Sequence, residues 1–192
     1  AGDGWTERRV GVADGKLAFT EVAAPDFAGP AGARDGEILE CAAAAEAVMT
    51  TLAARIARDG GALLAIDYGH DGAGFGDTLQ AVRAHRPDPP LARPGEADLT
   101  VHVDFARLAA VARASGAEPA PLLRQGEFLL TLGLLERAGR LGAGKDAEIQ
   151  AAIRAAVERL AGEAAMGHLF KVLCVTGAGL RLPPFAPPAP AG

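Results

Sequence analysis

Residues 62–69 read ALLAIDYG, and this stretch decides the fold class of the chain. It follows an alanine-rich segment, Ala42–Arg58, that predicts a helix, and the stop Asp59-Gly60-Gly61 separates the two. A continuous apolar run of this length is typical of a parallel strand buried on both faces. A helix followed by such a strand favours an α/β fold. Asp67 then lies at the carboxyl end of the strand, the edge where open α/β sheets bind ligands.

The flanking sequence supplies the other elements. Asp14-Gly15 between Glu7–Val12 and Lys16–Val22 predicts a β-hairpin, and Ala24–Arg34 reads as a loop. Two further strands are expected at Glu37–Cys41 and Leu169–Thr176, and Val48, Leu52 and Ile56 are expected to share the apolar face of the first helix. The remaining helices are expected at Thr78–His85, at Phe105–Ser115 with Asp104 as N-cap, at Gln125–Arg137 and at Ala147–Gly162.

Composition excludes several classes of function. Hydrophobic residues make up 49% of the 192 residues and the formal net charge is −5, so a core is expected but a basic nucleic-acid-binding face is not. No apolar run is long enough to insert into a membrane. Cys41 and Cys174 are far apart, without disulfide or metal-ligand spacing, so we expect no metal and a reducing, cytoplasmic location.

Glycines at positions 72, 74 and 76 follow the predicted strand and resemble a dinucleotide-binding loop. The third glycine of that fingerprint would fall at position 77, which is Asp77, and proline-rich sequence follows. The hypothesis that the protein is a nicotinamide-dependent oxidoreductase is based on this loop alone. A mobile loop over an active site is the alternative interpretation.

Five polar residues have two possible roles each. Asp67 either bonds to the neighbouring loop or serves an active site, and Glu127 is either a solvated first-turn acid or a functional one. His85 and His102 are either structural or proton-transfer residues. Lys171 interrupts the strand Leu169–Thr176, as an edge residue or as a charge partner.

Five segments, in this order and spacing, resemble the MidA-type class I methyltransferases. They are LAIDYG at 64–69, GDTLQAVRAH at 76–85, DLTVHVDF at 98–105, QGEFL at 125–129 and MGHLFKVL at 166–173. This family includes the mitochondrial protein-arginine methyltransferase that assists respiratory complex I assembly. The resemblance covers Trp5 to Cys174.

The resemblance implies a partial Rossmann-like α/β fold with an N-terminal β-hairpin, in which Ala62–Asp67 is the fifth strand and Leu169–Thr176 the seventh. The family's glycine-rich loop for S-adenosylmethionine would precede residue 1, so no cofactor-binding residue is identified. The chain also starts without Met. We therefore expect residues 1–176 to be the carboxyl-terminal part of a methyltransferase domain, and 177–192 a proline-rich tail. Such a piece would expose a sheet edge and apolar helix faces, so we expect it to associate or to be marginally stable when expressed alone.

Two positions depart from the family pattern. Glu40-Cys41-Ala42-Ala43 replaces a segment with Ser-Pro, and Arg124 replaces a Thr. Both departures put local substrate or cofactor contacts in question, but not the fold.

The implied reaction is methyl transfer from S-adenosylmethionine to an arginine of a protein, with a respiratory complex I subunit as the candidate acceptor. Asp67 and Glu127 would hold the guanidinium, and His85 would be a third catalytic residue. The expected substrate-binding residues are Tyr68, Gly69, Thr78, Arg83, Asp98, His102 and Gln125. A non-catalytic assembly or binding module is the alternative from another class.

Overall fold

A computed structural model describes residues 4–72 and 74–185 of the chain. These residues form two compact units. The hairpin unit comprises residues 4–40 and 74–101, and the sheet unit comprises residues 41–72 and 102–185. Each unit has its own strands, and all the helices of the described residues belong to the sheet unit.

The hairpin unit contains two small antiparallel sheets. β1 (Thr6–Ala13) pairs with β2 (Lys16–Ala23) along their full length, as predicted. Asp14 and Gly15 both have positive φ values, 51° and 72°, which is the turn geometry that Asp-Gly favours. In the second sheet, β4 (Gln80–Arg83) lies between β5 (Arg86–Asp88) and β6 (Asp98–Thr100).

Two sequence predictions in the hairpin unit are wrong. Thr78–His85 contains the strand β4 and no helix, because Gln80–Arg83 bonds to a strand on each side. Residues 37–40, and Cys41 after them, form no strand. Instead the Glu37 carboxylate folds back and accepts hydrogen bonds from the backbone N–H and the Nε of Arg34.

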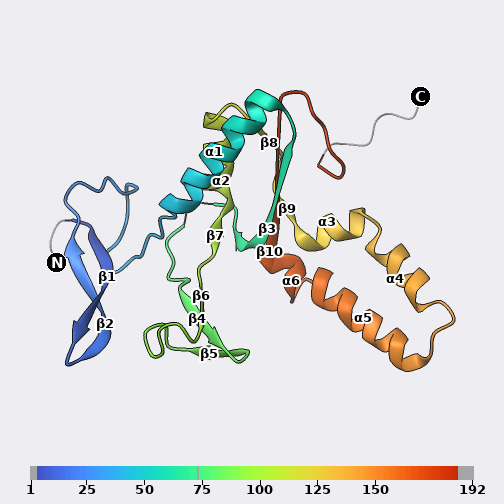
Figure 1. Cartoon of the computed structure of the whole chain (residues 1–192), viewed down its shortest axis with the longest axis horizontal. Helices are drawn as coiled ribbons and strands as arrows, with labels where there is room; N and C mark the ends of the chain where they lie inside the picture. The colour runs from blue at the N-terminus through green and yellow to red at the C-terminus, as the bar shows by residue number, and fades with distance from the viewer. Residues whose placement is uncertain (1–3, 73, 186–192) are drawn as a thin grey trace. The chain divides into compact units, whose positions relative to one another are not determined.

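The sheet unit is built on a mixed sheet with the order β7 (Val103–Asp104), β3 (Ala62–His70), β10 (Phe170–Thr176) and β8 (Glu118–Pro119) (Figure 1). β3 and β10 are antiparallel from Ala62↔Thr176 to Tyr68↔Phe170. β7 continues the sheet at the end of β3, parallel to it, and β9 (Leu123–Arg124) pairs with β10.

Helices α1 (Ala43–Asp59) and α2 (Phe105–Ala114) pack side by side on one face of this sheet. The core joins Met49, Ala53 and Ile56 of α1 to Phe105 of α2 and Leu173 of β10. The α2 N-cap is Asp104, as predicted, whose Oδ1 accepts a hydrogen bond of 2.9 Å from the backbone N–H of Arg107.

The inward face of α1 differs from the prediction. Of the expected stripe only Ile56 is buried, whereas Val48 and Leu52 are exposed. Met49 and Ala53, each one residue further along, take their places in the core. A helix of this alanine-rich composition has several apolar stripes, and the sheet selects among them.

β3 is buried on one face only, which contradicts the expectation of burial on both. Leu63 and Ala65 pack on the core, but Leu64 and Ile66 on the other face are 49% and 44% exposed. The reason is the alternation of side chains along a strand: α1 and α2 cover one face, and the described residues leave much of the other face open.

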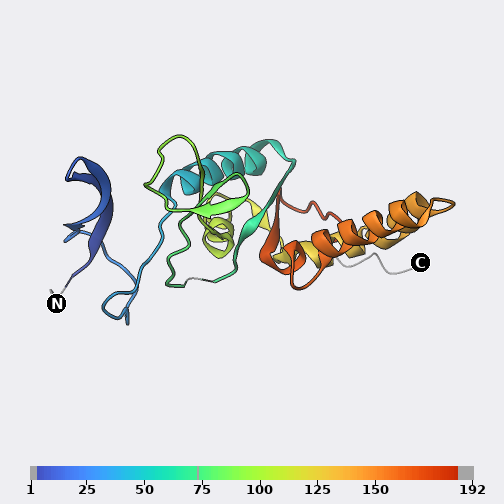
Figure 2. The same cartoon turned by 90° about the horizontal axis from the view of Figure 1, so that it is seen from below.

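The remaining helices are α3 (Gln125–Thr131), α4 (Leu134–Gly142), α5 (Ala147–Ala161) and α6 (Met166–Leu169). Figure 2 shows α4 and α5 as a helical pair joined by a short loop. The single helix expected over Gln125–Arg137 is two helices, because Gly133 takes a left-handed φ of 87° and ends the first. Residues 186–192 of the predicted tail lie outside the described residues.

Candidate acceptor site

The predicted site residues divide between the two units. Asp67, Tyr68, Gly69, His102, Gln125 and Glu127 belong to the sheet unit. Thr78, Arg83, His85 and Asp98 belong to the hairpin unit.

Tyr68, His102 and Phe170 form an aromatic cluster at the carboxyl end of β3. The Tyr68 ring contacts the His102 ring edge-on at 5.8 Å between centroids, and the Phe170 ring at 5.4 Å. Phe170 faces Tyr68 through the β3–β10 register, and His102 immediately precedes β7. Three segments far apart in the sequence thus meet at the sheet edge where the chemistry was expected.

Gly69 allows this meeting because it permits close approach of two strands. A Cβ at this position would lie 2.1 Å from the carbonyl oxygen of Val103 and 3.0 Å from the Phe105 ring. The parallel pairing of Gly69 with Val103 therefore requires a residue without a side chain. Gly69 acts here through packing, and its role in binding substrate stays a prediction.

Asp67 is exposed near the carboxyl end of β3, one position before Tyr68. Its Oδ1 accepts a hydrogen bond of 2.8 Å from the backbone N–H of Tyr68, which fixes the orientation of the carboxylate. Among the described residues its Oδ2 has no hydrogen-bond partner. A carboxylate held by one oxygen and open at the other is suited to a cationic donor.

Lys171 is a structural residue within the sheet. β10 lies between β3 and β9, so Lys171 faces Asp67 on one side and Arg124 on the other and is not at an edge. Its Nζ donates to the carbonyl oxygens of His168 and Leu169, at 2.7 and 3.3 Å, and so caps the end of α6. Desolvation by burial lowers the Lys171 pKa, opposed by the nearby charge of Asp71.

Gln125 and Glu127 lie on α3 with different surroundings. Gln125 is buried, and its Nε2 donates to the carbonyl oxygen of Leu160 at 2.8 Å, which attaches α3 to the end of α5. Glu127 is exposed in the first turn of α3, where a negative charge is favourable. Glu127 is therefore open to a ligand, whereas the Gln125 amide is already engaged by the fold.

In the hairpin unit, Thr78 is bound by Glu40, a residue that the sequence did not single out. The Glu40 carboxylate accepts from the Thr78 backbone N–H at 2.8 Å and from its hydroxyl at 2.5 Å. The backbone N–H of Gly76 also donates to the carbonyl oxygen of Ile38. Glu40 and Thr78 are 38 residues apart in the sequence, so no local pattern links them. The one sequence signal for Glu40 is its position next to Cys41-Ala42-Ala43, where the chain departs from the family pattern.

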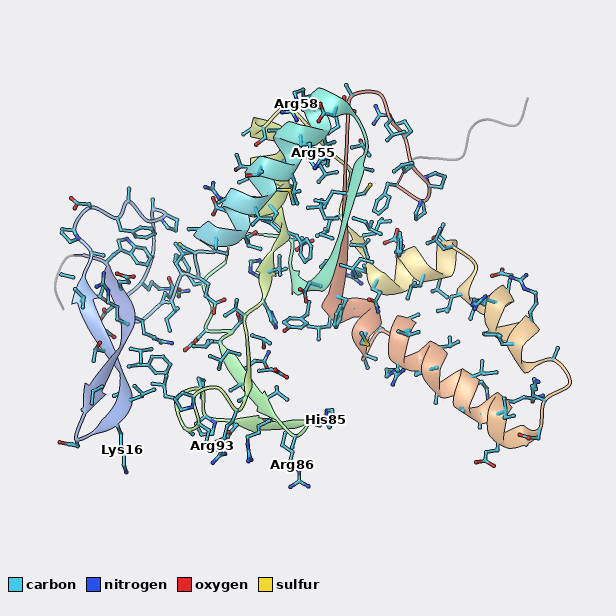
Figure 3. All side chains as sticks on the ribbon, viewed as in Figure 1. Lys16, Arg55, Arg58, His85, Arg86 and Arg93 are labelled. Atoms are coloured by element: carbon cyan, nitrogen blue, oxygen red, sulfur yellow. The ribbon has the colours of Figure 1, made fainter. Side chains whose placement is uncertain are left out.

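Arg83 and His85 lie at the β4–β5 turn. Arg83 forms an ion pair with Glu96 at 3.5 Å, and His85 is exposed at the tip with a φ of 61° (Figure 3). Asp98 is exposed at the start of β6, opposite Val82. An open hollow of about 430 Å³ beside this turn is lined by Arg83, Ala84, Arg86, Pro87, Asp88 and Arg93.

The glycine loop does not have the geometry of a dinucleotide site. Its described residues are followed by the strand β4, whereas a pyrophosphate site needs a helix N-terminus after the glycines. His70 bonds locally, with its Nδ1 2.6 Å from the carbonyl oxygen of Gly72. The nicotinamide interpretation therefore loses its basis.

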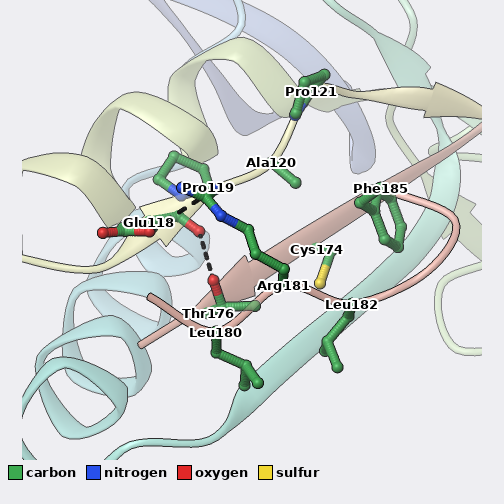
Figure 4. Close-up of a pocket in the computed structure, with 10 residues that line it drawn as sticks. All are labelled: Glu118, Pro119, Ala120, Pro121, Cys174, Thr176, Leu180, Arg181, Leu182 and Phe185. Carbon is green, nitrogen blue, oxygen red and sulfur yellow. Dashed lines mark hydrogen bonds and ion pairs between the residues drawn. The ribbon is translucent and has the colours of Figure 1, made fainter. Parts of the chain in front are cut away.

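A second hollow, of about 90 Å³, lies at the other end of the sheet (Figure 4). Cys174 and Thr176 line it with Leu182 and Phe185, and Thr176 donates to the Glu118 carbonyl oxygen at 3.3 Å. In the register these positions lie beside Ala62–Leu64, the start of β3, so this hollow is separate from the predicted site residues. It is also too small for a cofactor-sized ligand.

No group of three or more His, Cys, Asp or Glu side chains in the part of the chain that the structure describes is placed to hold a metal ion. Within the same part, every helix is too short or too polar to cross a bilayer.

Comparison with known proteins agrees with the resemblance. A family model described as an S-adenosyl-L-methionine-dependent methyltransferase matches residues 1–122. Protein arginine methyltransferase NDUFAF7, mitochondrial, from Danio rerio is 34% identical over 179 residues, which are 90% of this chain and 42% of that protein. The Drosophila melanogaster homolog is 40% identical over 125 residues, covering 65% of this chain and 28% of that protein.

A solved structure supports the fold. A Burkholderia thailandensis protein bound to S-adenosyl-homocysteine matches with a TM-score of 0.78 and 32% identity, over 91% of this chain and 48% of that one. The predicted Rossmann-like methyltransferase class is therefore confirmed. The chain spans less than half the length of these relatives.

The cytoplasmic location expected from the cysteines is wrong. The relatives from Danio rerio, Drosophila melanogaster and Mus musculus are all named as mitochondrial proteins. Free cysteines distinguish reducing from oxidising surroundings but cannot separate one reducing compartment from another. With the matching family model and the shared fold, the chain belongs to the S-adenosyl-L-methionine-dependent methyltransferase family.

Proposed function

We propose that the protein containing this chain transfers a methyl group from S-adenosylmethionine to an arginine nitrogen of another protein. One observation carries the proposal: relatives named protein arginine methyltransferase are 34–40% identical to it, and in one case the similarity covers 90% of the chain. A respiratory complex I subunit is the acceptor we propose, on the family resemblance alone.

The sheet unit would provide the acceptor side of the reaction. A guanidinium is planar and always charged, so it needs a carboxylate in its plane and tolerates aromatic rings against its face. Asp67 offers an open carboxylate oxygen, and the next residue of β3, Tyr68, contacts the His102 and Phe170 rings. Glu127 is the second exposed carboxylate that we assign to the guanidinium.

S-adenosylmethionine, when bound, supplies the methyl group, and we assign its pocket to residues outside this chain. The chain's own residues would orient the acceptor nitrogen for an in-line displacement, in which positioning provides much of the rate. We keep His85 as a proton-transfer candidate. Thr78, Arg83 and Asp98 remain proposed acceptor contacts in the hairpin unit. Gly69 would shape the site through its close packing on Val103, and Gln125 through its hydrogen bond to Leu160.

The test uses the full-length protein, S-adenosylmethionine labelled on its methyl group, and a protein acceptor. We expect Asp67→Asn and Glu127→Gln each to lower kcat/KM by about tenfold or more, because each removes a charged partner of the guanidinium. Unchanged transfer in both variants would remove the assignment.

Two matched variants serve as controls. Asp35→Asn changes an exposed loop acid, and Glu148→Gln changes an exposed acid in the first turn of α5, the same environment as Glu127 in α3. Both should retain full transfer. A loss in the controls equal to that in the site variants would show that net charge, and not the site, governs the rate.

A non-catalytic binding module is the second candidate, favoured by the glycine loop that leads into a strand. Calorimetry with S-adenosylmethionine, made on the full-length protein and on the isolated chain, separates a methyltransferase from a binding module. We expect the full-length protein to bind and these 192 residues alone not to bind. Absence of binding to the full-length protein would favour the module.

A further inference from the structure

The hollow beside the β4–β5 turn, here called the arginine hollow, carries an excess of positive charge. Its lining contains three arginines, Arg83, Arg86 and Arg93, against one carboxylate, Asp88. Arg93 engages both oxygens of Asp88, whose side chain is 9% exposed. The one acid in the lining is therefore already occupied and largely withdrawn from solvent.

The other two arginines are available. Arg86 has no acidic partner among the residues that the structure describes. Arg83 forms an ion pair with Glu96, whose side chain is 60% exposed, at 3.5 Å. Figure 3 shows Arg86 extending outward beside His85 at the end of the hairpin, with Arg93 on the loop after β5.

The backbone maintains this arrangement at a cost. Arg83 and Arg86 are directly opposite in the β4–β5 register, where like charges repel. The turn between them places Ala84 and His85 in the left-handed region, at φ values of 49° and 61°, without a glycine or asparagine to relieve the strain. Backbone strain of this kind is concentrated at functional sites.

We infer that the arginine hollow binds acidic side chains of the protein acceptor. The inference rests on the proposed function and names a feature of its substrate. The hollow would repel a guanidinium, so Arg83 would contact acidic side chains of the acceptor and not the arginine that is methylated. Arg86 and Arg93, which the sequence did not single out, complete the site.

A short acidic peptide fits these observations better than a nucleic acid. The lining contains no aromatic ring on which a base could stack, and Ala84 and Pro87 form its apolar wall. The chain's net charge of −5 is the reverse of the extended basic surface that nucleic acids require. Arginine forks also pair with carboxylates through two parallel hydrogen bonds.

The experiment measures binding of a fluorescent peptide to the full-length protein by anisotropy. The probe is an arginine peptide flanked by glutamates, and its control has glutamines at the same places. We expect the glutamate peptide to bind about tenfold more tightly, and this difference to shrink as salt is added. Equal affinity for the two peptides would overturn the inference.

Variants locate the site. Arg86→Glu should weaken binding of the glutamate peptide by about tenfold, whereas Lys16→Glu, the same charge change at the exposed β1–β2 turn of this unit, should have little effect. Equal losses in both variants would overturn the inference in favour of general electrostatics. Tighter binding of an RNA oligonucleotide or inorganic phosphate, lost in Arg86→Glu, would also overturn it.

The outcome is separable from that of the proposed function, because peptide binding is measured without S-adenosylmethionine. Methyl transfer without a preference for glutamates would leave the proposed function intact and remove the arginine hollow as its recognition site. A glutamate preference without methyl transfer would remove the proposed function and leave an acidic-peptide binding site.

Discussion

The two units differ most in how much apolar side chain they bury. In the sheet unit, Phe105 is 1% exposed and packs with both helices and β10. In the described part of the hairpin unit, Ala81 is the only buried hydrophobic residue, while Val10 and Val12 are 54% and 71% exposed. The sheet unit is therefore stabilised by a core, and the hairpin unit by surface contacts.

Those surface contacts are few, although several join residues far apart in the sequence. Trp5 packs on Phe27 and Phe75, and Arg8 pairs with Asp77 at 2.8 Å while its guanidinium lies over the Phe19 ring. Exposed ion pairs of this kind contribute little stability. A unit with few buried contacts is expected to open locally before the rest of the protein, a property common in segments that contact substrates.

The largest expected effect comes from the same substitution made in both units. Phe105→Ala should lower the free energy of unfolding by about 3–5 kcal/mol, because it leaves a cavity in the core. Phe19→Ala removes a side chain of a residue that is 43% exposed and should cost less than about 1 kcal/mol. Denaturant unfolding measures both, and similar losses would contradict the contrast between the units.

Gly69→Ala comes next, at about 1–3 kcal/mol, because the added methyl group would collide with the Val103 carbonyl. Gly72→Ala is the control, since a Cβ there meets no atom within 4 Å. Thermal unfolding of the two variants provides the comparison. If Gly69→Ala were as stable as Gly72→Ala, close packing of β3 on β7 would not hold the aromatic cluster together.

Asp104→Ala should cost about 1 kcal/mol through loss of the α2 N-cap. Asp104→Ser retains an oxygen that can accept from the Arg107 N–H, so it should recover most of that loss. Helical circular dichroism during urea unfolding measures both. Equal stability of the alanine and serine variants would show that the cap does not matter.

The smallest expected effect depends on pH. A hydrogen bond from Arg107, 2.7 Å long, lowers the Glu46 pKa below its ordinary value of 4.5. The pair therefore adds stability above about pH 4.5 that is lost as the pH falls through the lowered pKa. Glu46→Gln should cost less than about 1 kcal/mol at neutral pH and nothing near pH 2. A cost that grows in acid would contradict the sign.

Local signals predicted local structure well. Asp14-Gly15 predicted its hairpin and Asp104 its helix, because turn and cap chemistry act within a few residues. Predictions that depended on tertiary neighbours were less accurate: Leu64 and Ile66 are apolar but uncovered, and Gly133 divides a helix whose apolar pattern continues.

The candidate site shows the same division. Asp67 and Tyr68 were predicted because a strand's carboxyl end is visible in the sequence, and the structure brings His102 to Tyr68; their roles stay predictions. Glu40 and Arg86 were not found, because their significance depends on Thr78 and on the pairing with Arg83. The periodic pattern of apolar residues in the sequence does not indicate contacts between residues this far apart or across a turn.

Methyl transfer by the full-length protein tests the central claim most directly. The protein would be incubated with methyl-labelled S-adenosylmethionine and a complex I preparation, and the labelled product hydrolysed to amino acids. The account predicts label in methylarginine, reduced by Asp67→Asn and retained in Asp35→Asn. Label in a different amino acid, or label in methylarginine that Asp67→Asn leaves unchanged, would contradict it.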